Sequence, residues 1–157
     1  MKGLIIDVGS GGNPLAVKGI KVVHCDISRR ASVEVVCDAH YLPFRDKIFD
    51  AVYASHVIEH CLHPAKVLQE FKRVSKGRVI IKVMNTKLDY SDNSHLYSWN
   101  AKTLRQFLQR FFKNVEVYPT IRFDPYSNPV KRLLHKLKVL VTVSLFGRNE
   151  LTAICKI

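Results

Sequence analysis

The sequence has few of the features that mark secreted or membrane-spanning proteins. Its four cysteines are scattered and form no C-x-x-C pair, which favours a reducing, intracellular setting. The first apolar segment starts at once, leaving no room for a signal peptide, and the longest apolar run near the C-terminus, 139–146, is too short to cross a bilayer. We therefore expect a cytoplasmic protein without a transmembrane segment.

Acidic residues are scarce in the second part of the chain. Residues 1–60 hold seven Lys or Arg and seven Asp or Glu, whereas residues 61–157 hold eighteen against six, so the second part supplies the whole net charge of +12. Such a basic region favours a polyanionic partner, such as nucleic acid or an anionic membrane surface, or is a solvated, charged exterior. The length of 157 residues predicts one domain over 1–157, with a basic insertion at about 122–148.

Short apolar segments predict an open, mostly parallel α/β sheet, because several are continuous rather than alternating. One helix is expected to start at His63-Pro64 and to end before a left-handed Gly77, and a second to be capped by Asn100 or Ser98. The connections 13–19 and 27–32 are too short for ordinary crossover helices, so one or both helices should be a single turn or missing. The expected strands are 3–8, 20–25, 33–37, 49–54, 78–83, 115–118 and 151–157.

A glycine-rich turn follows the first expected strand. Gly9, Gly11 and Gly12 allow a ligand to approach the backbone, and Pro14 suits the first position of a short helix. The spacing is not the full G-x-G-x-x-G of dinucleotide sites, so an ordinary strand-turn-helix connection is the alternative.

Two acidic residues follow the next two expected strands. Asp26 comes after the second and Asp38 after the third, so both should lie with the glycine turn at the carboxyl edge of the sheet, where such folds bind ligands. A carboxylate after the second strand can accept hydrogen bonds from both ribose hydroxyls. Each acid alone could instead cap a turn.

These motifs, in order, resemble those of the class I S-adenosylmethionine-dependent methyltransferases. The similarity extends to Leu42-Pro43-Phe44 and to the segment 49–60, FDAVYASHVIEH, and is closest to the small-molecule-type branch with His-x-x-Glu-His after strand four. It implies a seven-stranded Rossmann-like sheet in the order 3-2-1-4-5-7-6 with the last strand antiparallel. The cofactor-binding residues it implies are Asp7, Gly9, Ser10, Gly11 and Gly12 for the methionine part, Asp26 with Ile27 for the ribose, Asp38 and Ala39 for the adenine, and Ser55 and His56 beside the sulfonium.

The segment 56–60, which contains His56, Glu59 and His60, has three interpretations. Any of these side chains could act as a base if the methyl acceptor must lose a proton. Alternatively, Glu59 and His60 only tie the loop to the next helix. The literal H-x-x-E-H zinc-protease pattern needs a helix that presents both histidines to one metal. Because this segment leaves a strand in a nucleotide-binding context, we expect no metal here.

The polar and aromatic stretch after the fifth expected strand is a candidate acceptor site. His95, Tyr97 and Trp99 could line a pocket for the methyl acceptor, as the similar element does in the resembling enzymes; alternatively, the two aromatic residues hold the helix start against the sheet. The basic and apolar segment 131–146 is a lid, a nucleic-acid contact, an interfacial helix or a charged surface helix.

The resemblance implies a methyltransferase that uses S-adenosylmethionine and transfers a methyl group by in-line displacement. The acceptor is nucleic acid or a small molecule, because the charge favours the first and the motifs the second. The alternative, from another functional class, is a non-catalytic nucleic-acid-binding protein on a methyltransferase-like scaffold. The sequence leaves the oligomeric state open.

Overall fold

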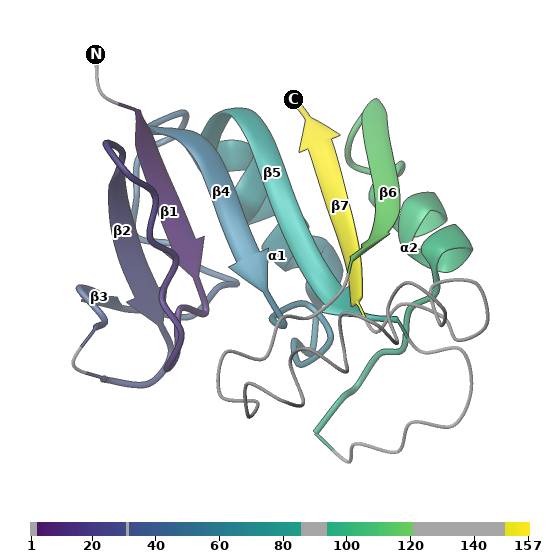
Figure 1. The fold of residues 1–157 in the computed structure, drawn as a ribbon, viewed down its shortest axis with the longest axis horizontal. Helices are drawn as coiled ribbons and strands as arrows, with labels where there is room; N and C mark the ends of the chain where they lie inside the picture. Colours follow the sequence, from purple (N-terminus) through teal and green to yellow (C-terminus); the bar gives the residue numbers. More distant parts are fainter. Residues whose placement is uncertain (1–2, 31, 86–93, 121–149) are drawn as a thin grey trace, which may run out of the picture.

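The computed structural model describes residues 3–30, 32–85, 94–120 and 150–157. They form a seven-stranded sheet in the order β3-β2-β1-β4-β5-β7-β6 (Figure 1). Strand β7 runs antiparallel to β5 and β6, and the other pairs are parallel. The predicted strand order and antiparallel last strand are confirmed. The strands are β1 Leu4–Val8, β2 Lys21–Asp26, β3 Val35–Val36, β4 Phe49–Ser55, β5 Ser75–Met84, β6 Asn114–Thr120 and β7 Glu150–Lys156.

One face of the sheet forms the apolar core. Ile6, Val52 and Ile81 are fully buried there, and their neighbours on the opposite face, Ile5 and Ile80, are only half-buried. Helix α1 lies behind the sheet in the view of Figure 1. The core is therefore built from every second residue of the central strands, packed against helices.

Helix α1, Pro64–Val74, begins where the sequence predicts and buries one apolar stripe, Val67, Leu68, Phe71 and Val74. Its predicted end is wrong. Ser75 is already extended and begins β5, so Gly77 lies within the strand instead of forming a left-handed cap. Gly77 has a packing reason instead, because a Cβ there would lie 3.3 Å from the carbonyl oxygen of Asp50.

Helix α2, Ala101–Leu108, is capped at its N-terminus by Asn100, one of the two predicted caps. The Asn100 Oδ1 accepts hydrogen bonds from the backbone N–H groups of Lys102 and Thr103. The Thr103 hydroxyl accepts the N–H of Asn100 in return, which completes a capping box. This helix is shorter than its apolar pattern suggests, and its buried residues are Leu104 and Leu108.

The described residues of the connections 13–19 and 27–32 contain no helix, which confirms the expected reduction of the fold. The expectation that Pro14 starts a short helix is therefore wrong. The chain instead crosses toward β2 without regular secondary structure, held by the backbone N–H of Leu15, which donates to Asp7 Oδ2 at 2.7 Å.

In the described part of the chain, no helix is long and apolar enough to span a membrane. The predicted basic insertion at about 122–148, including 131–146, lies outside the described residues.

Candidate functional site

A cavity of about 380 Å³ opens at the carboxyl ends of β1, β2 and β4. Its volume is within the usual range for small-molecule sites. Seven of the residues predicted from the sequence line it: Gly9, Asp26, Ile27, Asp38, Ala39, His56 and His60. The remaining lining residues are Val8, Cys37, His40, Val57, Cys61 and Leu62.

The glycine turn forms one wall of this cavity. Gly9 has a φ of +70°, and a Cβ at this position would lie 2.4 Å from Cγ2 of Val57, so only glycine fits both the backbone and the space. The N–H groups of Gly9 and Ser10 both donate to the carbonyl of Cys25, at 2.8 and 3.1 Å. These bonds fix the turn against the end of β2.

Asp26 connects the glycine turn to the segment that follows β2. Its Oδ2 accepts the N–H of Gly11 and its Oδ1 accepts the N–H of Ser28, each at 2.9 Å. A carboxylate has about four acceptor positions, so these two bonds orient the side chain and leave capacity for ligand hydroxyls.

Asp38 lines the cavity from the polar segment that follows β3. Its Oδ1 accepts the N–H of His40 at 2.9 Å and contacts the His40 ring nitrogen Nδ1 at 2.6 Å. These hydrogen bonds lower the pKa of Asp38 below its usual value, so the group is anionic at neutral pH. Two carboxylates, Asp26 and Asp38, therefore face one small space.

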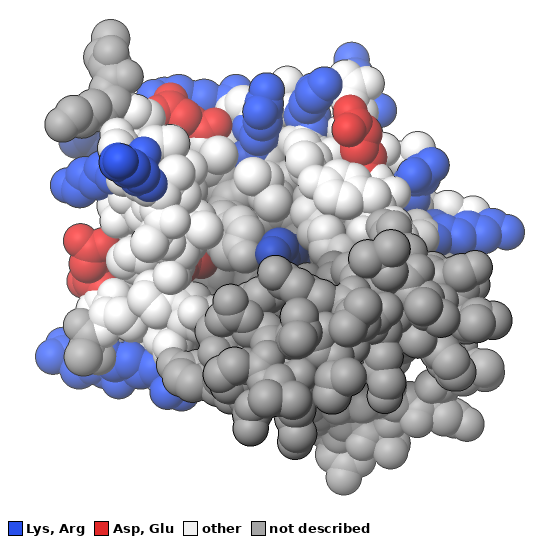
Figure 2. Space-filling view, in the orientation of Figure 1, with Lys and Arg blue, Asp and Glu red and all other residues white. Residues whose placement is uncertain are grey.

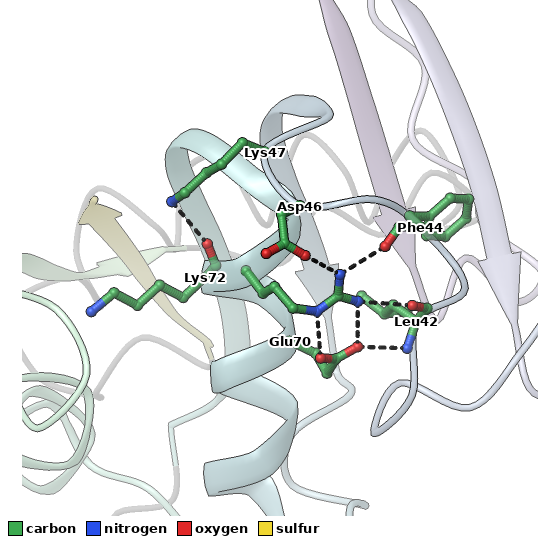
Figure 3. Close-up of polar contacts among 7 residues, drawn as sticks. Leu42, Phe44, Asp46, Lys47, Glu70 and Lys72 are labelled. Atoms are coloured by element: carbon green, nitrogen blue, oxygen red, sulfur yellow. Dashed lines mark hydrogen bonds and ion pairs between the residues drawn. The ribbon is translucent and has the colours of Figure 1, made fainter.

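Arg73 of α1 fixes the loop after Asp38 to this helix, and Figure 3 labels its partners Leu42, Phe44, Asp46 and Glu70. The guanidinium donates to the carbonyl oxygens of Leu42 and Phe44, at 2.9 and 2.7 Å. It also pairs with Glu70 and Asp46, each at 2.7 Å. The guanidinium of Arg73 presents five N–H donors in a fixed planar arrangement, so one side chain can hold several acceptors. The loop after Asp38 is thereby held to α1.

Five predicted cofactor residues do not line the cavity: Asp7, Ser10, Gly11, Gly12 and Ser55. Asp7 is 2% exposed and contacts His24 Nδ1 at 3.3 Å besides accepting the N–H of Leu15. Burial raises the pKa of Asp7 above its usual value. We infer that Asp7 holds the segment after the glycine turn in place from the buried side.

His56 is held between two carboxylates. Its Nδ1 lies 3.1 Å from Glu59 Oε1, and its Nε2 lies 3.0 Å from Glu150 Oε1. Hydrogen bonds to Glu150 and then to Glu59 raise the pKa of His56 to about 9. With both nitrogens engaged, the ring is an imidazolium at neutral pH and has no lone pair with which to act as a base.

Glu59 and His60 are brought together, although they differ in exposure. Glu59 is 1% exposed, and its carbonyl accepts the N–H groups of Leu96 and Tyr97, at 2.8 and 3.2 Å. His60 is exposed and lines the cavity. These backbone bonds tie the loop to the segment before α2, whereas the interpretation from the sequence joined Glu59 and His60 to the next helix along the chain, α1; that tie stays a prediction. Because both nitrogens of His56 contact carboxylates, the zinc-protease pairing of His56 with His60 is not formed.

The three predicted acceptor residues lie in this tied segment. Trp99 is 8% exposed, and its ring lies between those of Tyr97 and Phe107, with centroids 5.9 and 4.9 Å away. Trp99 thus packs against α2. The Tyr97 hydroxyl donates to the carbonyl of Leu62 at 3.1 Å, and the His95 ring packs edge-on against His60 with centroids 4.6 Å apart. An acceptor role for them stays a prediction.

Sequence reasoning missed Glu150, which lies 94 residues from its partner His56. No local motif marks it. The topology gives the only available signal, because an antiparallel last strand beside β5 starts at the edge of the sheet where β4 ends. Glu150, the first residue of β7, is paired with Met84 there.

Comparison with known proteins finds a family model that matches part of the chain. Residues 6–81 match the model of the methyltransferase domain family. A demethylmenaquinone methyltransferase of Paenarthrobacter aurescens is 36% identical over 90 residues, which cover 50% of this chain and 36% of that protein. A tRNA (carboxymethyluridine(34)-5-O)-methyltransferase, alkbh8 of Xenopus tropicalis, is 33% identical over 115 residues, covering 64% of this chain and 18% of that one.

The fold has its counterpart in solved structures. A SAM-dependent methyltransferase from Archaeoglobus fulgidus superimposes with a TM-score of 0.67 and 22% identity, covering 99% of this chain and 86% of that one. The chain spans less than half the length of the curated relatives described above.

Proposed function

We propose that this chain, whose sheet is that of the class I Rossmann-like methyltransferases and whose residues 6–81 belong to the methyltransferase domain family, is an S-adenosylmethionine-dependent methyltransferase. The observation that carries the proposal is the cavity at the carboxyl edge, where the Gly9 turn, Asp26 and Asp38 meet. Asp26 receives the ribose hydroxyls, and the wall at Asp38 and Ala39 receives the adenine.

Charge in the cavity supports a cationic cofactor. Asp26 and Asp38 contribute two negative charges. The imidazolium of His56 is more than balanced by Glu59 and Glu150, so these three side chains carry a net charge of −1. A sulfonium is thus drawn to an acidic space inside a basic protein.

The chemistry needs little beyond positioning. Methyl transfer is an in-line displacement on a donor that its own positive charge activates, and holding the reactants in line supplies on the order of 7 to 11 kcal/mol. We assign His56 to the positioning of Glu59 and Glu150, in place of the base considered from the sequence. His60 is exposed and lines the cavity, so it remains the candidate to accept a proton from an acceptor that must lose one.

Calorimetric titration with S-adenosylmethionine and its demethylated product tests the cofactor site. Asp26→Asn should weaken binding about 10- to 100-fold, because hydrogen bonds to a charged group contribute about 1.5–3 kcal/mol. Ala39→Phe should abolish binding by filling the cavity while leaving the turn hydrogen bonds intact.

Asp50→Asn is the matched control for these variants. Asp50 is an exposed carboxylate of the same sheet, and its Oδ2 accepts the N–H of Leu4 near the start of β1, away from the cavity lining. The affinity of Asp50→Asn for S-adenosylmethionine should equal that of the unmodified chain. Absence of binding by the unmodified chain, or unchanged binding in Ala39→Phe, would contradict the proposal.

The acceptor has support for two classes. The similarity to a demethylmenaquinone methyltransferase favours a small quinone-like molecule, and the similarity to a tRNA methyltransferase together with the net charge of +12 favours RNA. Incubation with methyl-labelled cofactor and separated small-molecule, lipid, protein, DNA and RNA fractions decides between them, because the labelled fraction identifies the class.

The second candidate function is nucleic-acid binding without catalysis. The charge supports it, since the chain carries a net charge of +12 and Lys and Arg are more prominent than Asp and Glu on the described part of the face in Figure 2. Salt-dependent nucleic-acid binding without cofactor binding would favour this function. Cofactor binding with turnover would reject it.

A further inference from the structure

Three potential metal ligands come together beside the cavity. Glu59 and His60 follow β4, and His95 lies in the segment before α2. One ligand atom from each lies within 4.8 Å of the others. Two imidazoles and one carboxylate are a ligand set that divalent transition metals prefer.

The carboxylate of Glu59 has an unused oxygen. Its side chain is 2% exposed, and Oε1 contacts His56 Nδ1 at 3.1 Å. The other oxygen, Oε2, is buried and has no hydrogen-bond partner among the described residues. A buried, unpaired carboxylate oxygen is costly, so its presence beside two histidines indicates a cationic ligand.

The ring of His60 is oriented for coordination. Its Nδ1 lies 3.0 Å from the carbonyl oxygen of Ser94, and a carbonyl only accepts, so Nδ1 carries the proton. The lone pair is then on Nε2. Metal-binding histidines are commonly fixed in this way by a hydrogen bond from the other ring nitrogen.

The two segments are held together independently of any metal. The N–H groups of Leu96 and Tyr97 both donate to the carbonyl of Glu59, which places His95 next to the loop. The rings of His60 and His95 pack edge-on, with centroids 4.6 Å apart. Ligands of tetrahedral zinc lie roughly 3.4 Å from one another, given bonds of about 2.0–2.1 Å. The three atoms, which lie within 4.8 Å of one another, must therefore approach one another when the metal binds.

We propose that Glu59, His60 and His95 bind a divalent transition-metal ion, with Zn²⁺ as the preferred ion. Three protein ligands leave a coordination position open. Because His60 also lines the cavity, the metal site lies beside the proposed cofactor site. With Nδ1 protonated and Nε2 bound to the metal, His60 has no free lone pair, so this assignment replaces its role as a base. His56, which contacts Glu59 on the side of Oε1, orients the carboxylate.

Equilibrium dialysis of the full, EDTA-treated chain against ZnCl₂, with bound metal counted by mass spectrometry, tests this site. One equivalent should bind, and His95→Gln and His60→Gln should each weaken binding by at least about 100-fold, because loss of an outer-shell partner alone costs about 10- to 100-fold. His63→Gln, which removes an exposed histidine of the same loop, is the matched control and should leave the affinity unchanged. The assay needs no cofactor, so its result is independent of the proposed methyl transfer.

Co²⁺ substitution gives a second measurement. Visible absorption typical of nitrogen and oxygen ligands should appear in the unmodified chain and disappear in His95→Gln, whose melting temperature checks that the fold is retained. A thiolate-to-cobalt charge-transfer band would show binding by the cysteines and overturn the proposal. So would the absence of stoichiometric Zn²⁺, or equal affinity in His95→Gln and the unmodified chain.

Discussion

The helix-covered face of the sheet and its carboxyl edge are built by different forces. On the covered face, Ile6, Val52 and Ile81 are fully buried among apolar neighbours from α1 and the adjacent strands. At the carboxyl edge, the Asp26 carboxylate accepts backbone N–H groups from the glycine turn and from Ser28, and the Asp38 carboxylate accepts the N–H of His40 within its own loop. Packing dominates one region and polar geometry the other.

This difference separates stability from binding. Apolar burial contributes about 25 cal/mol for each Å² removed from water, so the covered face supplies most of the folding free energy. The hydrogen bonds of the edge contribute about 1 kcal/mol each, but they set the position of every cavity wall. Variants of the first region should change stability, and variants of the second should change ligand affinity.

The largest expected effect is on the covered face. Ile81→Ala should lower the free energy of unfolding by about 2–5 kcal/mol, because it leaves a cavity in a fully buried site. Ile80→Ala, its neighbour on the opposite face of β5, should cost less than about 1.5 kcal/mol, because that side chain is only half-buried. Urea unfolding measures both, and equal losses would show that the two faces are packed alike.

A smaller effect is expected at the glycine turn. Gly9→Ala combines left-handed backbone strain with a clash against Val57, so we expect a loss of about 2–4 kcal/mol and of cofactor binding. Gly19→Ala is the control, because Gly19 has a φ of +78° but a Cβ there would meet no described atom within 4 Å. It should cost only the strain, about 1–2 kcal/mol, and retain binding.

Arg73 connects the two regions, and its removal should have an intermediate cost. Arg73→Ala leaves the carbonyls of Leu42 and Phe44 without this donor, which should cost about 1–2 kcal/mol. Hydrogen exchange should rise in the loop 40–47 more than in β1. Gln69→Ala, an exposed change on the same helix, should leave the exchange unchanged; uniform acceleration in Arg73→Ala would mean that Arg73 supports the core as a whole.

Sequence patterns predict the packed region well, and the order of the strands is predicted only by the resemblance to the class I methyltransferases. The stripe of Val67, Leu68 and Phe71 identifies α1 because helical spacing is a local property. Three other features depend on contacts between distant parts of the chain. They are the end of α1 before Ser75, the irregular path after Pro14 and the contact of Glu150 with His56. The turn, Asp26 and Asp38 could be placed together because parallel strands end at one edge, whereas the direction of Asp7 could not.

The last expected effect depends on pH and concerns His56 in the metal-free chain. Glu150 and Glu59 raise its pKa from 6.5 to about 9, so the folded state binds this proton more tightly than the unfolded state. The stabilisation is fully present below pH 6.5 and is lost as the pH rises through about 9. Imidazole NMR should follow this titration, and urea unfolding should show stability falling over the same interval. Glu150→Gln should lower the pKa of His56 and flatten that fall, whereas Ile81→Ala should lower stability at every pH and leave the slope intact. An unchanged slope in Glu150→Gln would mean that the electrostatics of the edge do not depend on the start of β7.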